Sequence, residues 1–234
     1  MLTPPEIARS LLAAGESKAR LPFGKMLLLA ILAGAYIALA GVGATAAAVT
    51  VESGSLAKLL SACVFPAGLS MVILAGSELF TGNCLMVMAL LERRITPAQL
   101  LRNWLTVYLG NAVGGAAVAA LAVYSHTASL FGDGLARSMV SIAESKAALG
   151  FGDAFLRGVL CNFLVCLAVW MAAASKRAEG KVIALFFPIL LFVLCGYEHC
   201  IANLYYLPAG AFAAAEYGMG TCLLYTTDAA DDRI

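Results

Sequence analysis

Long apolar runs separated by short polar segments dominate the chain. Six runs lack Asp, Glu, Lys and Arg, and they cover residues 26–51, 59–77, 103–132, 158–175, 182–197 and 199–215. Because a membrane-spanning helix requires about 20 apolar residues, the first four runs with their flanks are each long enough to cross a bilayer. Only Glu198 separates the last two short runs, so we interpret them as one interrupted span.

A second interrupted span occurs earlier, where Glu78 lies inside the mostly apolar stretch 59–91. We therefore predict an all-α membrane protein, a single integral membrane domain over 1–234. The predicted membrane elements are helices over 26–50, 98–124 and 154–175 and broken helices over 57–91 and 182–215. Residues 1–25 predict a short amphipathic helix before the first span, with Ile7, Leu11 and Leu12 on its apolar face.

One motif occurs in both broken helices, at residues 65–83 and 187–203. Each copy consists of F-P, an apolar run and then G-x-E-x4-N. A glycine and a carboxylate inside an apolar run indicate a break in the helix. In duplicated membrane units such breaks meet at a substrate site near the bilayer midplane. An odd number of spans in each half predicts an inverted repeat, with a first repeat over 26–124 and an incomplete second repeat over 154–215.

The duplication requires a sixth helix, and the end of the chain does not supply one. After Glu216 only the short apolar run 219–225 precedes an acidic end. We expect residues 220–234 to be a non-native or truncated tail that replaces the sixth helix.

The charges are few, and they are distributed unevenly. The chain is 62% hydrophobic and 12% charged. Ten Lys and Arg residues lie in the N-terminal segment and in the connections that follow the first broken helix and the 154–175 helix, whereas four lie on the other side. The positive-inside rule then places the N-terminus in the cytoplasm, and we expect a multi-pass protein of the inner or plasma membrane.

The same composition makes other partners and cofactors unexpected. No cluster of Lys and Arg with interleaved aromatic residues indicates a nucleic-acid surface. The seven cysteines are scattered without a C-x2-C pair, so we predict neither a disulfide framework nor a metal site. We expect no cofactor.

Two polar residues at the breaks are candidates for a pore site. Thr81 supplies a hydroxyl at the first break, and His199 supplies an imidazole at the second. A single buried histidine is more often a structural residue, but here the neighbouring Glu198 and the twofold pattern favour a functional one. Half-helix N-termini also attract anions. We predict a Thr81–His199 pair at the centre of a pore.

The residues at these positions resemble the formate/nitrite transporter family, which also contains hydrosulfide channels. Four stretches carry the resemblance, and they cover residues 78–83, 102–111, 158–171 and 196–203. The resemblance implies an aquaporin-like six-helix protomer, a homopentamer and one anion pathway in each protomer. It places Thr81 and His199 at the central site.

The resemblance also implies roles for further residues. Apolar constrictions on either side of the central site correspond to Phe65, Leu69, Leu79, Phe80, Val165 and Phe192. Lys146 corresponds to a lysine that makes the vestibule potential more positive, with Glu198 and Asn203 as its network. Without the resemblance, Lys146 would be interpreted as a solvated loop lysine beside Glu144.

We therefore expect a channel or transporter for small monovalent anions in a lipid bilayer, either passive or coupled to protons through His199, and not an enzyme. Formate is the first candidate, followed by hydrosulfide and nitrite.

An aquaporin-like channel for neutral solutes is the nearest alternative, although neither half contains an N-P-A triplet. A membrane oxidoreductase would need two membrane histidines for haem, and the second histidine, His126, lies at the end of the 98–124 helix. A scaffold without transport would leave Glu78 and Glu198 unexplained.

Overall fold

The computed structural model describes residues 1–221, which contain helices and no strand. The α-helices are α1 (Pro4–Ala19), α2 (Phe23–Ala48), α3 (Gly54–Val64), α4 (Pro66–Ala75), α5 (Phe80–Asn83), α6 (Val87–Leu91), α7 (Pro97–Tyr124), α8 (Gly134–Ala147), α9 (Phe151–Ala173), α10 (Ala178–Leu194) and α11 (Cys200–Glu216). Two 3-10 turns, η1 (Cys84–Met86) and η2 (Thr127–Ser129), complete the element order. The all-α prediction is confirmed.

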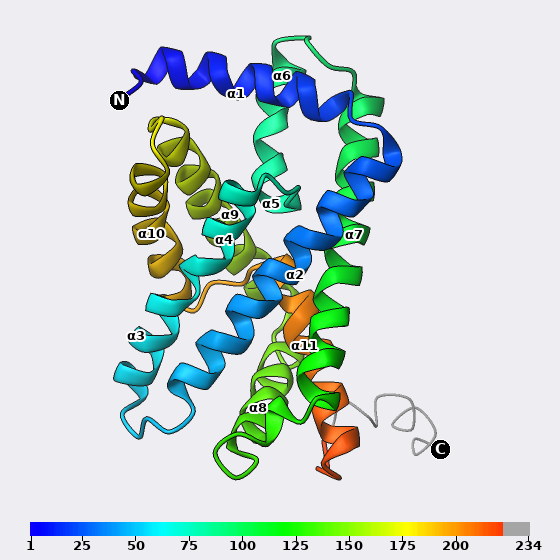
Figure 1. Cartoon of the computed structure of the whole chain (residues 1–234), viewed down its shortest axis with the longest axis vertical. Helices are drawn as coiled ribbons and strands as arrows, with labels where there is room; N and C mark the ends of the chain where they lie inside the picture. The colour runs from blue at the N-terminus through cyan, green and yellow to red at the C-terminus, as the bar shows by residue number, and fades with distance from the viewer. Residues whose placement is uncertain (222–234) are drawn as a thin grey trace.

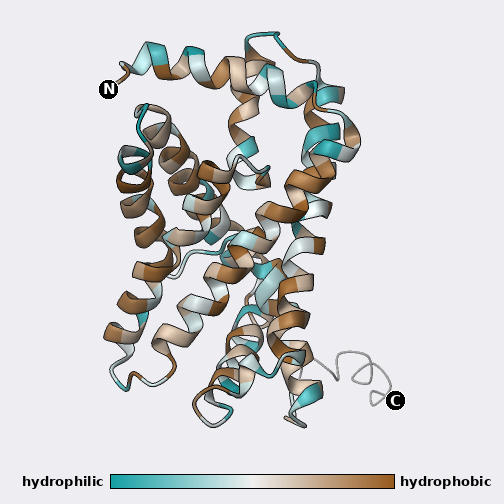
Figure 2. Cartoon of the chain, viewed as in Figure 1, coloured by the Kyte–Doolittle hydropathy of each residue, from teal (hydrophilic) through white to brown (hydrophobic). Residues whose placement is uncertain are grey.

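Four segments are long and apolar enough to cross a membrane, namely Phe23–Ala48, Gly54–Ala75, Pro97–Tyr124 and Phe151–Ala173. The second of these joins α3 and α4. Hydrophobic residues dominate the middle of the helix bundle, and hydrophilic residues gather in α1 and in the loops at both ends (Figure 2). This distribution is typical of a chain whose helices cross a bilayer.

Both predicted breaks occur at a glycine in the left-handed conformation. Gly76 ends α4 with a φ of 76°, and Gly196 follows α10 with a φ of 70°. Glycine adopts this conformation without the steric cost of a Cβ. Each break then runs through three residues before a new helix begins at Phe80 or Cys200.

The backbone groups exposed by the first break are satisfied by neighbouring helices. The Asn111 amide of α7 donates to the Glu78 carbonyl oxygen at 2.9 Å, and its Oδ1 atom accepts from the Phe80 N–H at 3.0 Å. The Glu78 N–H donates to the Leu29 carbonyl oxygen of α2 at 3.2 Å. Non-helical backbone at membrane depth requires such partners, so α2 and α7 hold the break in place.

Small residues allow α2 and α7 to pack backbone against backbone. Gly34 and Gly110 lie in this contact, and a Cβ atom on Gly114 would overlap the Ile31 carbonyl oxygen. Close approach through small residues is the usual way in which helices associate in lipid. The α2–α7 pair therefore forms the support against which the first break is built.

Alanine at Gly114 is expected to lower the stability of the folded protein by about 2 kcal/mol, because the added methyl group forces α2 and α7 apart. Gly24→Ala is the matched control, since no atom lies within 4 Å of a Cβ added there. Both variants gain helix propensity, so the difference between them isolates the steric cost. Thermal unfolding of the detergent-solubilised protein measures it, and equal midpoints for the two variants would contradict the packing argument.

The two ends of the bundle are covered differently. Helix α1 lies across one end, and α8 lies at the other, packed against α11 (Figure 1). The sequence pattern did not predict α8, which occupies the region interpreted as a connection between two spans. The limits of the predicted repeats and the missing sixth helix stay predictions, and the predicted tail over 220–234 falls almost entirely on residues 222–234, outside the described part of the chain.

Candidate functional site

The two breaks bring Thr81 and His199 together. Thr81 lies in α5 directly after the first break, and His199 is the residue that precedes α11 after the second. Their Oγ1 and Nε2 atoms are 3.2 Å apart, and the two residues are 3% and 4% exposed. Residues 118 positions apart in the sequence thus form one buried polar pair at the place where the breaks meet.

The hydrogen bonds of His199 assign its tautomer. The Ala202 N–H donates to Nδ1 at 3.1 Å and so caps α11. An Nδ1 atom that accepts a hydrogen bond carries no proton, so the proton of the neutral ring is on Nε2. Nε2–H then donates to Thr81 Oγ1. The Thr81 hydroxyl hydrogen is therefore available to a further acceptor.

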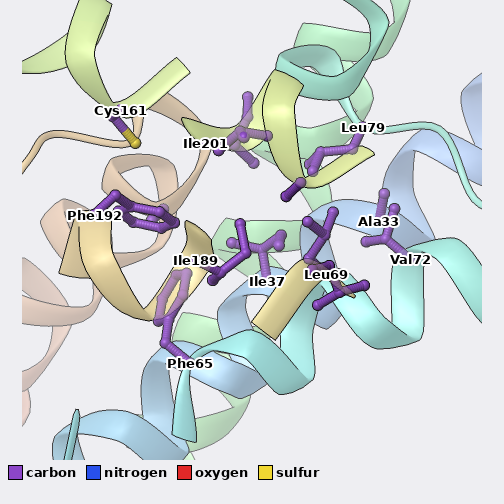
Figure 3. Packing of buried hydrophobic residues seen from close by; sticks show 14 of the residues in the cluster. Ala33, Ile37, Phe65, Leu69, Val72, Leu79, Cys161, Ile189, Phe192 and Ile201 are labelled. Carbon is purple, nitrogen blue, oxygen red and sulfur yellow. The ribbon is translucent and has the colours of Figure 1, made fainter. Parts of the chain in front are cut away.

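An apolar constriction lies beside this pair. A cavity of about 10 Å³, close to the smallest volume that holds one water molecule, is lined by Ile37, Phe65, Leu69, Leu79, Val165, Ile189, Phe192 and His199. The Phe65 and Phe192 rings meet edge to face with centroids 5.6 Å apart, and Phe192 also stacks on the His199 ring at 5.6 Å. Figure 3 shows Ile37, Leu69 and Ile189 gathered with the two phenylalanine rings around this point.

Five of the six residues predicted for the constrictions line this cavity, and Phe80 does not. Its ring packs edge to face against Trp104 and Tyr108 of α7, with centroids 6.0 and 5.3 Å away. Phe80 is the first residue of α5, and the direction of its side chain follows from the rotation of that short helix.

A charged group lies on the α8 side of the pair. Lys146 Nζ donates to Glu198 Oε2 at 2.7 Å, and Asn203 Nδ2 donates to the same oxygen at 2.9 Å. The Lys146 ammonium also lies over the Tyr206 ring, 5.2 Å from its centroid. The three residues that the sequence grouped as a network are therefore in direct contact.

An equivalent group lies on the opposite side, and sequence reasoning did not find it. Lys18 of α1 donates to Glu78 Oε1 at 2.7 Å, and Asn83 Nδ2 donates to Glu78 Oε2 at 2.8 Å. Asn103 of α7 accepts a second hydrogen bond from Asn83 at 2.9 Å. Each break thus carries a glutamate that accepts from one lysine and one asparagine, through a single oxygen at Glu198 and through both oxygens at Glu78.

A larger cavity, which we call the α8 vestibule, leads from one end of the bundle to His199. Its volume is about 710 Å³. Lys58, Arg137, Lys146 and Arg157 are the basic residues that line it, and Glu198 is its acidic residue. Among the described residues no cluster of three metal-binding side chains occurs, and the lining of the vestibule is suited to anions.

Comparisons with known proteins place this arrangement in a family. The family described as formate/nitrite transporter matches residues 5–227. The chain belongs to the formate/nitrite transporter family. A protein named probable formate transporter, from Methanothermobacter thermautotrophicus, is 38% identical over 229 residues, which cover 90% of this chain and 83% of that relative.

Two solved structures of this transporter family share the fold. A pentameric formate channel with formate bound has a TM-score of 0.75 and 31% identity, covering 88% of this chain and 84% of that channel. A structure titled FNT family ion channel has a TM-score of 0.81 and 30% identity, covering 95% and 92%. As a family member with four helices suited to cross a bilayer, the chain is a multi-pass membrane protein and a transporter, not an enzyme.

The sequence contains a signal that could have identified Lys18 as the partner of Glu78. The twofold motif includes the glutamate and asparagine of both breaks, and Lys146 was assigned to the second glutamate only. Applying the same symmetry to Glu78 would have required a second basic residue on the N-terminal side of the first repeat. Four candidates were available there, Arg9, Lys18, Arg20 and Lys25, and only the position of α1 distinguishes Lys18.

Proposed function

We propose that the protein is a homopentameric channel that conducts formate through each protomer. Membership of the formate/nitrite transporter family supports the substrate class, and the pentameric formate channel with 31% identity supports the assembly. The observation that carries the assignment of the pathway is the Thr81–His199 contact of 3.2 Å, which lies beside an apolar constriction. Hydrosulfide and nitrite, as similarly small monovalent anions, are alternative substrates of the same path.

Charge and desolvation together explain how such a path conducts a weak acid. Lys18 and Lys146 lie on opposite sides of the Thr81–His199 pair, each paired with a glutamate. On the α8 side Lys58, Arg137 and Arg157 add the positive charge that attracts an anion to the vestibule. Entering the apolar constriction removes water from the anion, which disfavours its charged form and increases its affinity for a proton. The neutral acid formed by protonation then passes the constriction at a lower cost than the anion.

His199 acts in this scheme as a hydrogen-bond donor and not as a proton carrier. A proton added to Nδ1 would face the Ala202 N–H at 3.1 Å and remove the cap of α11. The neutral ring keeps the cap and orients the Thr81 hydroxyl, which donates to the passing anion. The proton comes from the water of the vestibule, so that flux is coupled to protons without a change in the charge of His199.

The arrangement in the membrane follows from the repeat. The two Lys–Glu–Asn groups at the two breaks support an inverted repeat with an aquaporin-like path, in which the breaks enter from opposite sides. We place the N-terminus and α1 in the cytoplasm, because the basic residues concentrate on that side. The inner or plasma membrane is the proposed location.

Flux into liposomes tests this function. Protein-containing vesicles are expected to take up formate at least about tenfold faster than empty vesicles, and the rate is expected to rise as the pH falls, because more of the anion is protonated. Nitrite and hydrosulfide measured in parallel rank the substrates. Water or glycerol permeability without formate uptake would instead indicate the aquaporin-like alternative.

A further inference from the structure

The α8 vestibule is lined by four cationic side chains and one carboxylate. We propose that it is a binding site for a divalent oxyanion of the sulfate or hydrogenphosphate class, and that this anion competes with the transported anion at the entrance. The binding is independent of the proposed function, whereas the competition rests on it.

Four cationic side chains surround the cavity from three helices. Lys58 comes from α3, Arg137 and Lys146 come from opposite ends of α8, and Arg157 comes from α9. Lys58 lies close enough to Lys146 and Glu198 to interact electrostatically with both. The site is therefore assembled by the tertiary structure, from segments separated by up to 99 positions in the sequence.

Most of this charge is uncompensated. Glu198, the acidic residue of the lining, is already paired with Lys146 at 2.7 Å. Within residues 1–221, no carboxylate lies within 4.0 Å of a nitrogen of Lys58, Arg137 or Arg157. Three like charges around one cavity repel each other, and a bound dianion relieves that repulsion while gaining attraction from each of them.

Serine side chains of α8 also line the cavity between the charges. The Ser145 hydroxyl donates to the Ser141 carbonyl oxygen at 2.8 Å, which leaves Ser138 and Ser141 as the hydroxyl donors. Ser138, Ser141 and Ser145 recur every three to four residues along α8 and all line the cavity, so they share one face of the helix. Hydroxyls and guanidinium groups together match the several acceptor oxygens of a tetrahedral oxyanion. The cavity of about 710 Å³ has ample room for such an anion with part of its water.

A dianion bound in the α8 vestibule cannot pass through the apolar constriction. The passage beside His199 is apolar and its cavity measures about 10 Å³. A monovalent weak acid loses its charge with one proton, but a dianion that gains one proton remains charged and strongly hydrated. Its transfer into the constriction is therefore prohibited by desolvation, and the anion stays at the entrance where the transported anion must pass.

Direct titration tests the binding without reference to transport. Sodium sulfate is titrated calorimetrically into the full-length protein in detergent, with sodium chloride at equal ionic strength as the comparison. Sulfate is expected to bind and chloride to bind much more weakly. Lys58→Gln and Arg157→Gln are each expected to weaken sulfate binding by about two- to fivefold, and the double variant by about tenfold.

Arg9→Gln is the matched control, because Arg9 is an exposed arginine of α1 at the other end of the bundle. It is expected to leave sulfate binding unchanged. Equal sulfate affinity in the wild type and in the folded double variant would overturn the site, as would an equal response to sulfate and chloride, which would reflect general screening of charge.

Flux measurements test the competition. With sulfate at equal concentration on both sides of the vesicles, the formate concentration for half-maximal flux is expected to rise while the maximal flux is unchanged. The effect is expected to be lost in the Lys58→Gln/Arg157→Gln variant. Sulfate binding in a protein that does not conduct formate would leave the site intact and refute the proposed function, whereas normal formate flux without sulfate binding or inhibition would refute the site alone.

Discussion

Asparagine in place of His199 is expected to lower formate flux by about 10- to 100-fold while the protein stays folded. A hydrogen bond to a charged group contributes about 1.5–3 kcal/mol, and each 1.36 kcal/mol lost at the barrier changes the rate about tenfold. Asparagine is a favoured N-cap residue, so it replaces the bond from the Ala202 N–H to Nδ1. It is too short to reproduce the contact of Nε2 with Thr81. The initial rate of formate uptake into liposomes measures the effect.

Further variants test whether His199 and Thr81 act through their mutual contact. Thr81→Ala is expected to lower flux by a similar factor, and the double variant by less than the product of the two, because both residues act through one contact. His126→Asn is the control, since this exposed histidine lies at the end of α7 in a left-handed conformation that asparagine tolerates. Wild-type flux in both His199→Asn and Thr81→Ala would end the assignment of the central site.

Methionine in place of Lys18 is expected to destabilise the folded protein by about 3 kcal/mol. The side chain of Glu78 is 6% exposed and its Oε1 atom lies 2.7 Å from the Lys18 ammonium. Removing the ammonium leaves a buried carboxylate whose remaining side-chain donor is Asn83. An unpaired buried charge costs far more than the pair itself contributes. Thermal unfolding in detergent, followed by the loss of monodisperse protein, measures the change.

A second variant removes the Glu78 carboxylate that Lys18→Met leaves unpaired. The double variant Lys18→Met/Glu78→Gln is expected to regain most of the lost stability. A neutral glutamine at position 78 leaves no unpaired buried charge when the lysine is absent. Lys25→Met removes an exposed lysine from the same end of the chain and is expected to change little. A double variant that unfolds as early as Lys18→Met would show that Lys18 acts through packing and not through its charge.

The fold class, the family and the two breaks could be predicted because each rests on a local pattern. Gly76 and Gly196 interrupt apolar runs and are each followed two residues later by a carboxylate, and such residues in a membrane helix indicate an irregular backbone lined by protein. The twofold motif then led to Thr81 and His199, because each is a polar residue at one of the two breaks, although they occupy different positions of the motif, five residues after Gly76 and three after Gly196. The contact of 3.2 Å between them agrees with that expectation, while their role in conduction stays a prediction.

Other features were decided by the tertiary structure, because they depend on how distant segments are oriented. Lys18 and Glu78 are 60 positions apart in the sequence, and they meet only because α1 lies across one end of the bundle. The ring of Phe80 follows the rotation of a four-residue helix toward Trp104 and Tyr108. The α8 helix has a helical apolar pattern, with Leu135, Met139 and Ala143 among its buried residues. Its low overall hydrophobicity does not indicate a membrane span, so the apolar runs alone predict only a connection there. The sequence alone thus determined where the helices break and which polar groups lie at the breaks. Packing determined which charges face each other, since the direction of a side chain and its distance from a remote partner have no periodic signal in the chain.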